Sequence, residues 1–135
     1  MKNLFTVKTF AIAFLFFAAA ETKAQSLYFC ESVDKDGYAI NESNTFVIGN
    51  NGGYFDFLVR MPYDLRSYYI NYDIYEVESD GTEKFSETIR QDSQPDWQFF
   101  WKEITFYDAG TYKIYVYDDD DYLITSSTVK VKKQY

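Results

Sequence analysis

Four consecutive aspartates, residues 118–121, are the residues of this 135-residue chain whose type and spacing most directly suggest chemistry. They lie between two strand-like runs, so a hairpin loop would bring their carboxylates together. Clustered carboxylate oxygens suit Ca²⁺, which takes six to eight oxygen ligands. Aspartate is also a good turn residue, and a charged tip keeps a hairpin soluble. The sequence therefore allows two interpretations of Asp118, Asp119, Asp120 and Asp121. They form either a site for Ca²⁺, the one cofactor considered, or an ordinary turn.

Catalysis finds little support in the residue types. The chain has no histidine, which removes Ser-His and Cys-His nucleophiles and the usual zinc sites. Carboxylate pairs such as Asp92 with Asp96 have the groups for glycosidase chemistry, but no motif marks two of them as facing each other. We expect a protein without catalytic activity, and a small hydrolase is the unfavoured alternative.

Aromatic side chains on a sheet surface are the other candidates, first in the run "WQFFWKEITF" at residues 97–106. If Ile104 and Phe106 face the core, alternation along a strand also sends Phe100 inward. The opposite face then carries a row of Trp97, Phe99 and Trp101. Exposed apolar patches usually bind something, here a protein or a glycan. The alternative is a bulge near Lys102 that returns Trp101 to the core.

Four tyrosines on two other expected strands are also candidate binding residues, namely Tyr69, Tyr75, Tyr115 and Tyr117. The same alternation turns them outward, opposite buried aliphatic residues. Cross-strand tyrosine pairs stabilise a sheet without any ligand, by about 0.2 to 1 kcal/mol each. The sequence favours that structural use over a binding role.

The elements that position these residues are short runs of β-branched and aromatic residues separated by Gly, Asn, Asp and Ser clusters. This pattern is typical of an antiparallel all-β sandwich or barrel. The runs are residues 26–32, 45–48, 54–61, 68–77, 83–91, 97–106, 111–117 and 122–132. The first two are expected to pair around the acidic turn at 34–37, and 83–91 is expected to be a charged edge strand. In 54–61, Phe55, Phe57 and Val59 share one face, while Leu58 breaks the alternation.

The segment "DAGTYKI" contains Asp108, Gly110 and Tyr112 in the pattern Asp-x-Gly-x-Tyr. It resembles the tyrosine corner of immunoglobulin-like β-sandwiches, in which a tyrosine near the start of strand F bonds to upstream backbone. The segment with its preceding "ITF" also resembles polycystin-type (PKD) immunoglobulin-like domains. The resemblance implies a sandwich of about seven strands and no activity. Gly110 is expected to provide a positive φ or a close backbone approach.

The N-terminus has the features of a secretory signal peptide. Lys2 and Lys8 precede an apolar run at residues 10–20, which is too short to span a membrane, and small residues end it. We expect cleavage before Gln25, which gives a signal peptide at 1–24 and one sandwich domain at 25–135. An uncleaved membrane anchor is the alternative. The expected location is outside the cytoplasm, either secreted or in the periplasm or at the cell surface.

The charge of the chain limits the classes of partner that it can bind, and its cysteine content limits the bonds that it can form. Residues 1–24 contain three of the 13 basic residues and one of the 21 acidic residues. The rest of the chain therefore has 10 basic and 20 acidic residues, which gives it a formal charge of −10. Such a surface repels nucleic acid and anionic lipid. The single cysteine, Cys30, cannot form an internal disulfide, and we expect it to be buried and inert. The sequence thus favours an exported binding or assembly module with a protein or glycan partner, and a Ca²⁺-stabilised adhesion module is the alternative.

Overall fold

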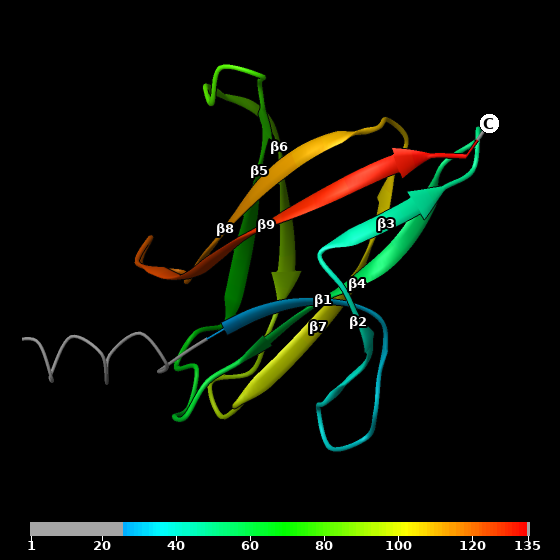
Figure 1. The fold of residues 1–135 in the computed structure, drawn as a ribbon. Coiled ribbons are helices and arrows are strands. Elements are labelled where there is room, and N and C mark those ends of the chain that lie inside the picture. Colours follow the sequence, from blue (N-terminus) through cyan, green and yellow to red (C-terminus); the bar gives the residue numbers. More distant parts are fainter. Residues whose placement is uncertain (1–25, 135) are drawn as a thin grey trace, which may run out of the picture.

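The computed structural model describes residues 26–134, in which all regular elements are β-strands (Figure 1). The strands are β1 (Ser26–Val33), β2 (Ala39–Glu42), β3 (Thr45–Ile48), β4 (Gly53–Arg60), β5 (Tyr69–Val77), β6 (Glu83–Asp92), β7 (Phe99–Phe106), β8 (Gly110–Tyr117) and β9 (Leu123–Lys133). The expected signal peptide lies outside the described residues. Within 26–134 there is no helix that could cross a membrane.

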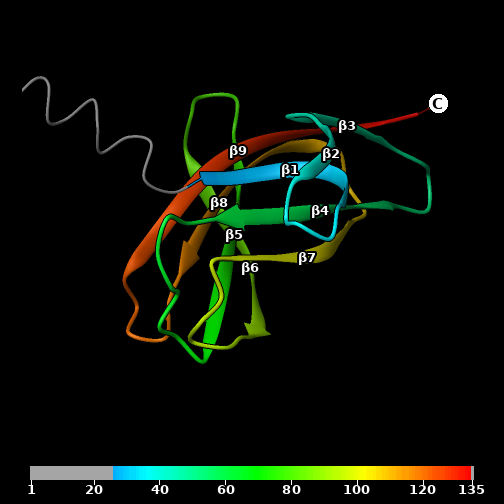
Figure 2. The same cartoon turned by 90° about the horizontal axis from the view of Figure 1, so that it is seen from below.

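The strands form two sheets packed against each other, and Figure 2 shows the smaller sheet in front of the larger one. The smaller sheet has the order β2-β1-β4-β7 and the larger one β3-β9-β8-β5-β6. All ladders are antiparallel except that between β3 and β9. In immunoglobulin notation β4 and β7 correspond to strands B and E, and β5, β8 and β9 to C, F and G. The chain is therefore an immunoglobulin-like β-sandwich, and β6 is its charged edge strand as expected.

The core lies between the sheets and is built largely from aromatic rings. Phe55 of β4 stacks on Phe106 of β7 with ring centroids 5.1 Å apart, and Phe57 meets Tyr72 of the other sheet edge-on at 5.5 Å. Phe55, Phe57 and Val59 all point inward, which confirms the predicted alternation. Burying one such side chain contributes about 1.5 to 3 kcal/mol. No disulfide is needed to hold these sheets together.

The tyrosine corner is present. The Tyr112 hydroxyl donates to the Asp108 carbonyl at 2.8 Å, and the Tyr112 ring is buried against Phe106 at a centroid distance of 4.8 Å. Gly110 does not have a positive φ. A β-carbon built there would lie 3.4 Å from the Tyr112 ring, an ordinary van der Waals distance, so neither of the two expected reasons for this glycine is found. The corner fixes the connection between β7 and β8.

The expected pairing of the first two runs is wrong. The partner of β1 around the acidic turn is β2, a four-residue strand that the sequence did not reveal. Residues Thr45–Ile48 instead cross to the other sheet as β3 and pair in parallel with the C-terminal strand β9. This ladder joins residues more than 80 positions apart, which no local pattern encodes. The two short strands bring the number in 26–134 to nine rather than about seven.

Cys30 is fully buried, as expected, on the outer side of β1. Its thiol faces the Asp56 carbonyl at 4.0 Å. Burial, followed by the negative charge of Asp56, raises the pKa of this thiol to about 11. The thiolate is therefore strongly disfavoured at neutral pH, and an inert role fits Cys30.

Candidate functional site

Two aromatic rings stand side by side on the outer face of the smaller sheet. Phe99 and Trp101 occupy alternate positions at the start of β7, with centroids 6.3 Å apart and ring planes 16° apart. The pairing of β7 with β4 runs without a register shift, so there is no bulge at Lys102 to turn Trp101 inward. Trp101 is 44% exposed, whereas Phe100 between the two is buried. The expected orientation of Phe99 and Trp101 is confirmed.

The third member of the expected row, Trp97, does not lie on this face. It precedes β7 in a loop, where its amide donates to the Gln94 carbonyl at 3.2 Å. Its side chain packs against the core and stacks near Phe100 at 6.4 Å. The expectation was wrong because strand alternation begins only at Phe99, and a turn sets the direction of the residues before it.

The turn between β1 and β2 folds over this outer face. Gly37 lies flat against the Phe99 ring, so closely that a β-carbon would sit 2.5 Å from ring atoms. The Arg60 guanidinium donates to the carbonyls of Asp36 and Gly37. It also lies over two rings, at 4.0 Å from the centroid of Tyr38 and 5.6 Å from that of Phe99. Arginine thus ties the turn to the sheet through hydrogen bonds and cation–π contacts.

Leu58 also points to the outer face, yet it is fully buried. In the sheet register it lies between Tyr28 of β1 and Trp101 of β7. The two large rings beside it and the turn nearby make a second, small apolar layer outside the main core. Leu58, which breaks the alternation in β4, therefore lies at a covered position of this outer face.

A groove of about 920 Å³ opens beside these rings. Its lining comes from the β1–β2 turn, the ends of β4 and β6, the loop before β7 and the start of β7, and comprises Asp36, Arg60, Met61, Gln91, Asp96, Trp97, Gln98, Phe99, Phe100 and Trp101. Both tryptophans of the chain are among them. Four of these ten residues are aromatic and five are polar or charged, and a concave surface that combines aromatic rings with polar groups is a common form of a binding site.

The two amides of the groove are held in place. Gln91 accepts from the buried Tyr72 hydroxyl at 2.7 Å and donates to the Trp101 carbonyl at 2.8 Å, which links the free edges of the two sheets. Gln98 donates to Asp64 at 3.0 Å. The groove therefore has a wall that is fixed by hydrogen bonds between the sheets.

The four tyrosines lie on the outer face of the other sheet, away from the groove. Tyr75 meets Tyr115 edge-on at 5.5 Å, and Tyr115 stacks beside Tyr117 at 6.5 Å. Tyr69 lies under the Arg90 guanidinium at 3.9 Å. The Tyr115 hydroxyl donates to Glu83 at 2.6 Å, and mainly this bond raises its pKa to about 12. All four rings are half-buried against neighbours, an arrangement that stabilises the sheet by itself.

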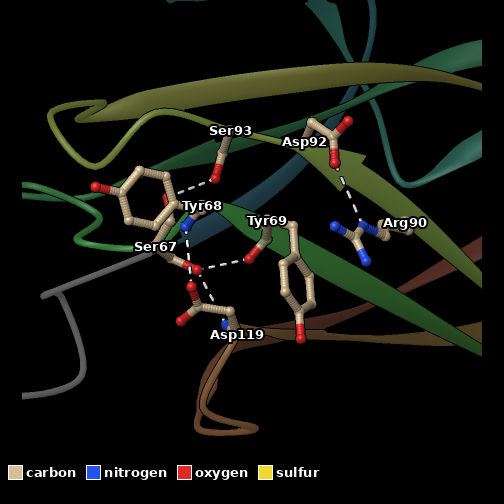
Figure 3. Close-up of polar contacts among 7 residues, drawn as sticks. All are labelled: Ser67, Tyr68, Tyr69, Arg90, Asp92, Ser93 and Asp119. Carbon is tan, nitrogen blue, oxygen red and sulfur yellow. Dashed lines mark hydrogen bonds and ion pairs between the residues drawn. The ribbon is translucent and has the colours of Figure 1, made fainter.

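The aspartate run forms a turn that is attached to the neighbouring loop (Figure 3). Asp119 accepts from the Tyr68 amide and donates its own amide to the Ser67 hydroxyl, both at 3.0 Å. Ser67 is fully buried, and its carbonyl accepts from the Ser93 hydroxyl at 2.7 Å. Three loops of the sandwich are joined through these contacts.

Asp118 acts inside the turn, where one carboxylate oxygen accepts from the amides of Asp120 and Tyr122 at 2.9 Å each. The carboxylates of Asp120 and Asp121 make no bond among residues 26–134, and Asp118 and Asp119 each use one carboxylate oxygen in the bonds above. Across residues 26–134 no three His, Cys, Asp or Glu side chains gather as a metal site would require. The structure uses this run as a turn and does not bring its carboxylates together.

Sequence reasoning missed several groove residues, above all Asp36, Arg60 and Gln91. The pairing of β4 with β7 places Arg60 opposite Phe99, and the folding of the distant β1–β2 turn over the sheet brings Asp36 to the groove. The available signal was the break at Leu58, which indicated a cover without identifying it. The four tyrosines of the larger sheet and the aspartate run 118–121 do not line this groove.

No protein-family model matches the chain, and no curated protein matches it. Among solved structures, an immunoglobulin-like protein (PA1606) from Pseudomonas aeruginosa is 12% identical with a TM-score of 0.49, covering 79% of this chain and 92% of its own. A superoxide reductase (neelaredoxin) from Ignicoccus hospitalis is 14% identical with a TM-score of 0.47, covering 86% of each chain. The CARDB domain of PF1109 from Pyrococcus furiosus, solved with two metal ions, is 10% identical with a TM-score of 0.41, covering 83% and 97%. Matches of this strength carry no activity to this chain.

Proposed function

We propose that this protein is an exported, non-catalytic binding module whose partner engages the groove beside Phe99 and Trp101. Export is inferred from the charged, then apolar, then small-residue pattern of residues 1–24. The binding role is inferred from the groove. The partner is expected to be a protein or a glycan, and nucleic acid is disfavoured by the negative charge of the chain.

The observation that carries the proposal is the stacked, partly exposed pair of Phe99 and Trp101 on a fixed strand. The Phe99 ring is held between the β1–β2 turn and the sheet, and the backbone of Trp101 is held by Gln91. Rings that are already ordered lose little conformational freedom on binding, which favours affinity. Aromatic side chains at the centre of a binding surface are also the residues that most often dominate its energy.

The absence of catalysis is supported by the groups in the groove. The chain has no histidine, and the ionisable groove residues among those described are Asp36, Arg60 and Asp96. Asp92, which would pair with Asp96 in a glycosidase, forms an ion pair with Arg90 at 3.3 Å. With no histidine in the chain, a Ser-His or Cys-His nucleophile cannot form, whereas a binding role needs none.

The test compares two aromatic truncations in the sandwich, residues 25–135, whose strands all lie in the described part of the chain. Trp101→Ala removes the exposed ring of the groove, and Tyr122→Ala removes a 71% exposed ring on the β8–β9 turn. Each protein is screened on an array of oligosaccharides and against a displayed random-peptide library, after circular dichroism has confirmed its fold. We expect selected ligands to be lost with Trp101→Ala and kept with Tyr122→Ala. Ligands that bind all three proteins equally would contradict the proposal.

A further inference from the structure

We propose that the groove binds a cationic side chain, arginine or lysine, presented by a partner protein. The inference rests on the proposed function and specifies the chemistry of that same site. It follows from two features of the groove, namely its aromatic rings and the carboxylates of Asp36 and Asp96.

The rings of this face already hold a guanidinium. Arg60 lies at 4.0 Å over Tyr38 and 5.6 Å from the Phe99 centroid. The face therefore provides an internal example of cation–π binding by its own rings. Trp101 stands next to Phe99 in a nearly parallel plane and keeps 44% of its surface exposed. Tryptophan is the best cation–π acceptor among side chains, and here its exposed surface is open to a second cation.

Two of the three charged residues in the described lining are negative. Asp36 and Asp96 both line it and are exposed, and neither carboxylate has a bonding partner among residues 26–134. Arg60, the basic residue of the described lining, already donates to two backbone carbonyls. A carboxylate only accepts hydrogen bonds, so Asp36 and Asp96 suit a donor-rich, positively charged ligand. The formal charge of −10 on residues 25–135 would also steer such a ligand toward the surface.

The experiment measures binding of short synthetic peptides to residues 25–135 by calorimetry at about 0.15 M salt, where diffuse surface attraction is screened beyond about 8 Å. One peptide alternates serine with arginine, a second alternates serine with lysine, and a third alternates serine with citrulline, the neutral isostere of arginine. We expect the two cationic peptides to bind at least about tenfold more tightly than the citrulline peptide. Equal binding of the charged and neutral peptides, or no binding of any, would overturn the inference.

Matched variants separate the groove from general acidity. Asp36→Asn with Asp96→Asn removes two negative charges at the groove, and Asp120→Asn with Asp121→Asn removes two on the remote β8–β9 turn, where the side chains make no bond among the described residues. We expect the groove pair to weaken the arginine peptide about tenfold and the remote pair less than about twofold. Equal losses would mean diffuse attraction and would overturn the inference.

The outcomes distinguish the inference from the proposed function. An oligosaccharide or a neutral peptide that binds in a Trp101-dependent way, while the cationic peptides do not, overturns the cationic ligand and leaves the binding groove in place. If no ligand of any class is lost with Trp101→Ala, both fail. If the cationic peptides bind and require Trp101 together with Asp36 and Asp96, both are supported.

Discussion

Residues 34–38 and 118–122 form the same backbone turn on two different hairpins. In each, an aspartate at the first position accepts from the amides two and four residues later, at 2.9 to 3.0 Å. In each, the first amide donates to the carbonyl of the fifth residue, and the fourth amide donates to the carbonyl of the first. The fourth residue is left-handed in both cases, as Gly37 with φ 83° and as Asp121 with φ 64°. This is the pattern of a type I turn closed by a left-handed residue.

The two turns differ in what surrounds them. Gly37 is buried against Phe99, and its turn becomes the cover of the smaller sheet and part of the groove wall. Asp121 is exposed, and its turn is attached through Asp119 to the buried Ser67 (Figure 3). The local sequence thus encodes the turn, whereas the contacts of one or two side chains decide whether the turn shapes a binding surface or only closes the end of the sandwich.

Replacing the buried glycine should have the largest effect. We expect Gly37→Ala to lower the free energy of unfolding by about 2 to 4 kcal/mol, since alanine is strained at this φ and its β-carbon would push the Phe99 ring. Guanidinium denaturation measures the loss. Gly81→Ala is the matched control, because Gly81 has φ 90° in a turn with open space around it and should lose only about 1 kcal/mol. Equal losses would mean that the Phe99 contact contributes nothing.

The attachment of the second turn depends on a buried hydroxyl. Ser67 accepts from the Asp119 amide and donates to the Tyr69 carbonyl at 2.6 Å, so Ser67→Ala leaves both groups without that partner. We expect a loss of about 1 to 3 kcal/mol in the same denaturation assay. Ser79→Ala, at an exposed turn position, should stay within about 0.5 kcal/mol of the parent. A Ser67 variant as stable as the Ser79 variant would show that the turn is not held by these contacts.

The residues that could be predicted from the sequence are those whose determinants are local. The hydrogen bond of the corner joins Tyr112 to a residue only four positions earlier. The outward orientation of Phe99 and Trp101 follows from the alternation of side chains along a strand. The predicted orientation of Trp97 was wrong because Trp97 lies in a loop, where strand alternation does not set the direction of a side chain. The parallel pairing of β3 with β9 and the contact between Gly37 and Phe99 join distant segments, so they depend on how the sheets pack and not on any pattern within one run.

The tyrosine corner can be compared with both turns. Its hydrogen bond is local, as in the turns, but its ring is buried in the core. Tyr112→Phe removes only the hydroxyl that donates to Asp108 and keeps the contact with Phe106. We expect the fold to persist and the free energy of unfolding to fall by about 0.5 to 1.5 kcal/mol. The exposed Tyr122→Phe should leave it unchanged. An unaltered denaturation midpoint for Tyr112→Phe would contradict a stabilising role of the corner bond.

The smallest expected change has the opposite sign and tests whether the two turns are the same structure. Asp121 holds a left-handed φ that L-residues other than Asn and Asp rarely adopt, and its side chain is exposed and makes no bond among residues 26–134. Asp121→Gly gives this turn the residue that Gly37 supplies in the other and removes one charge from a run of four. Relief of the strain outweighs the greater freedom of glycine in the unfolded chain, so we expect a gain of about 0.5 to 1 kcal/mol. Asp120→Gly changes the same charge without relieving a left-handed φ and should give no gain. A loss of stability in Asp121→Gly would mean that the aspartate side chain supports the turn in a way that Gly37 cannot, and the two turns would then share a backbone shape without sharing its energetics.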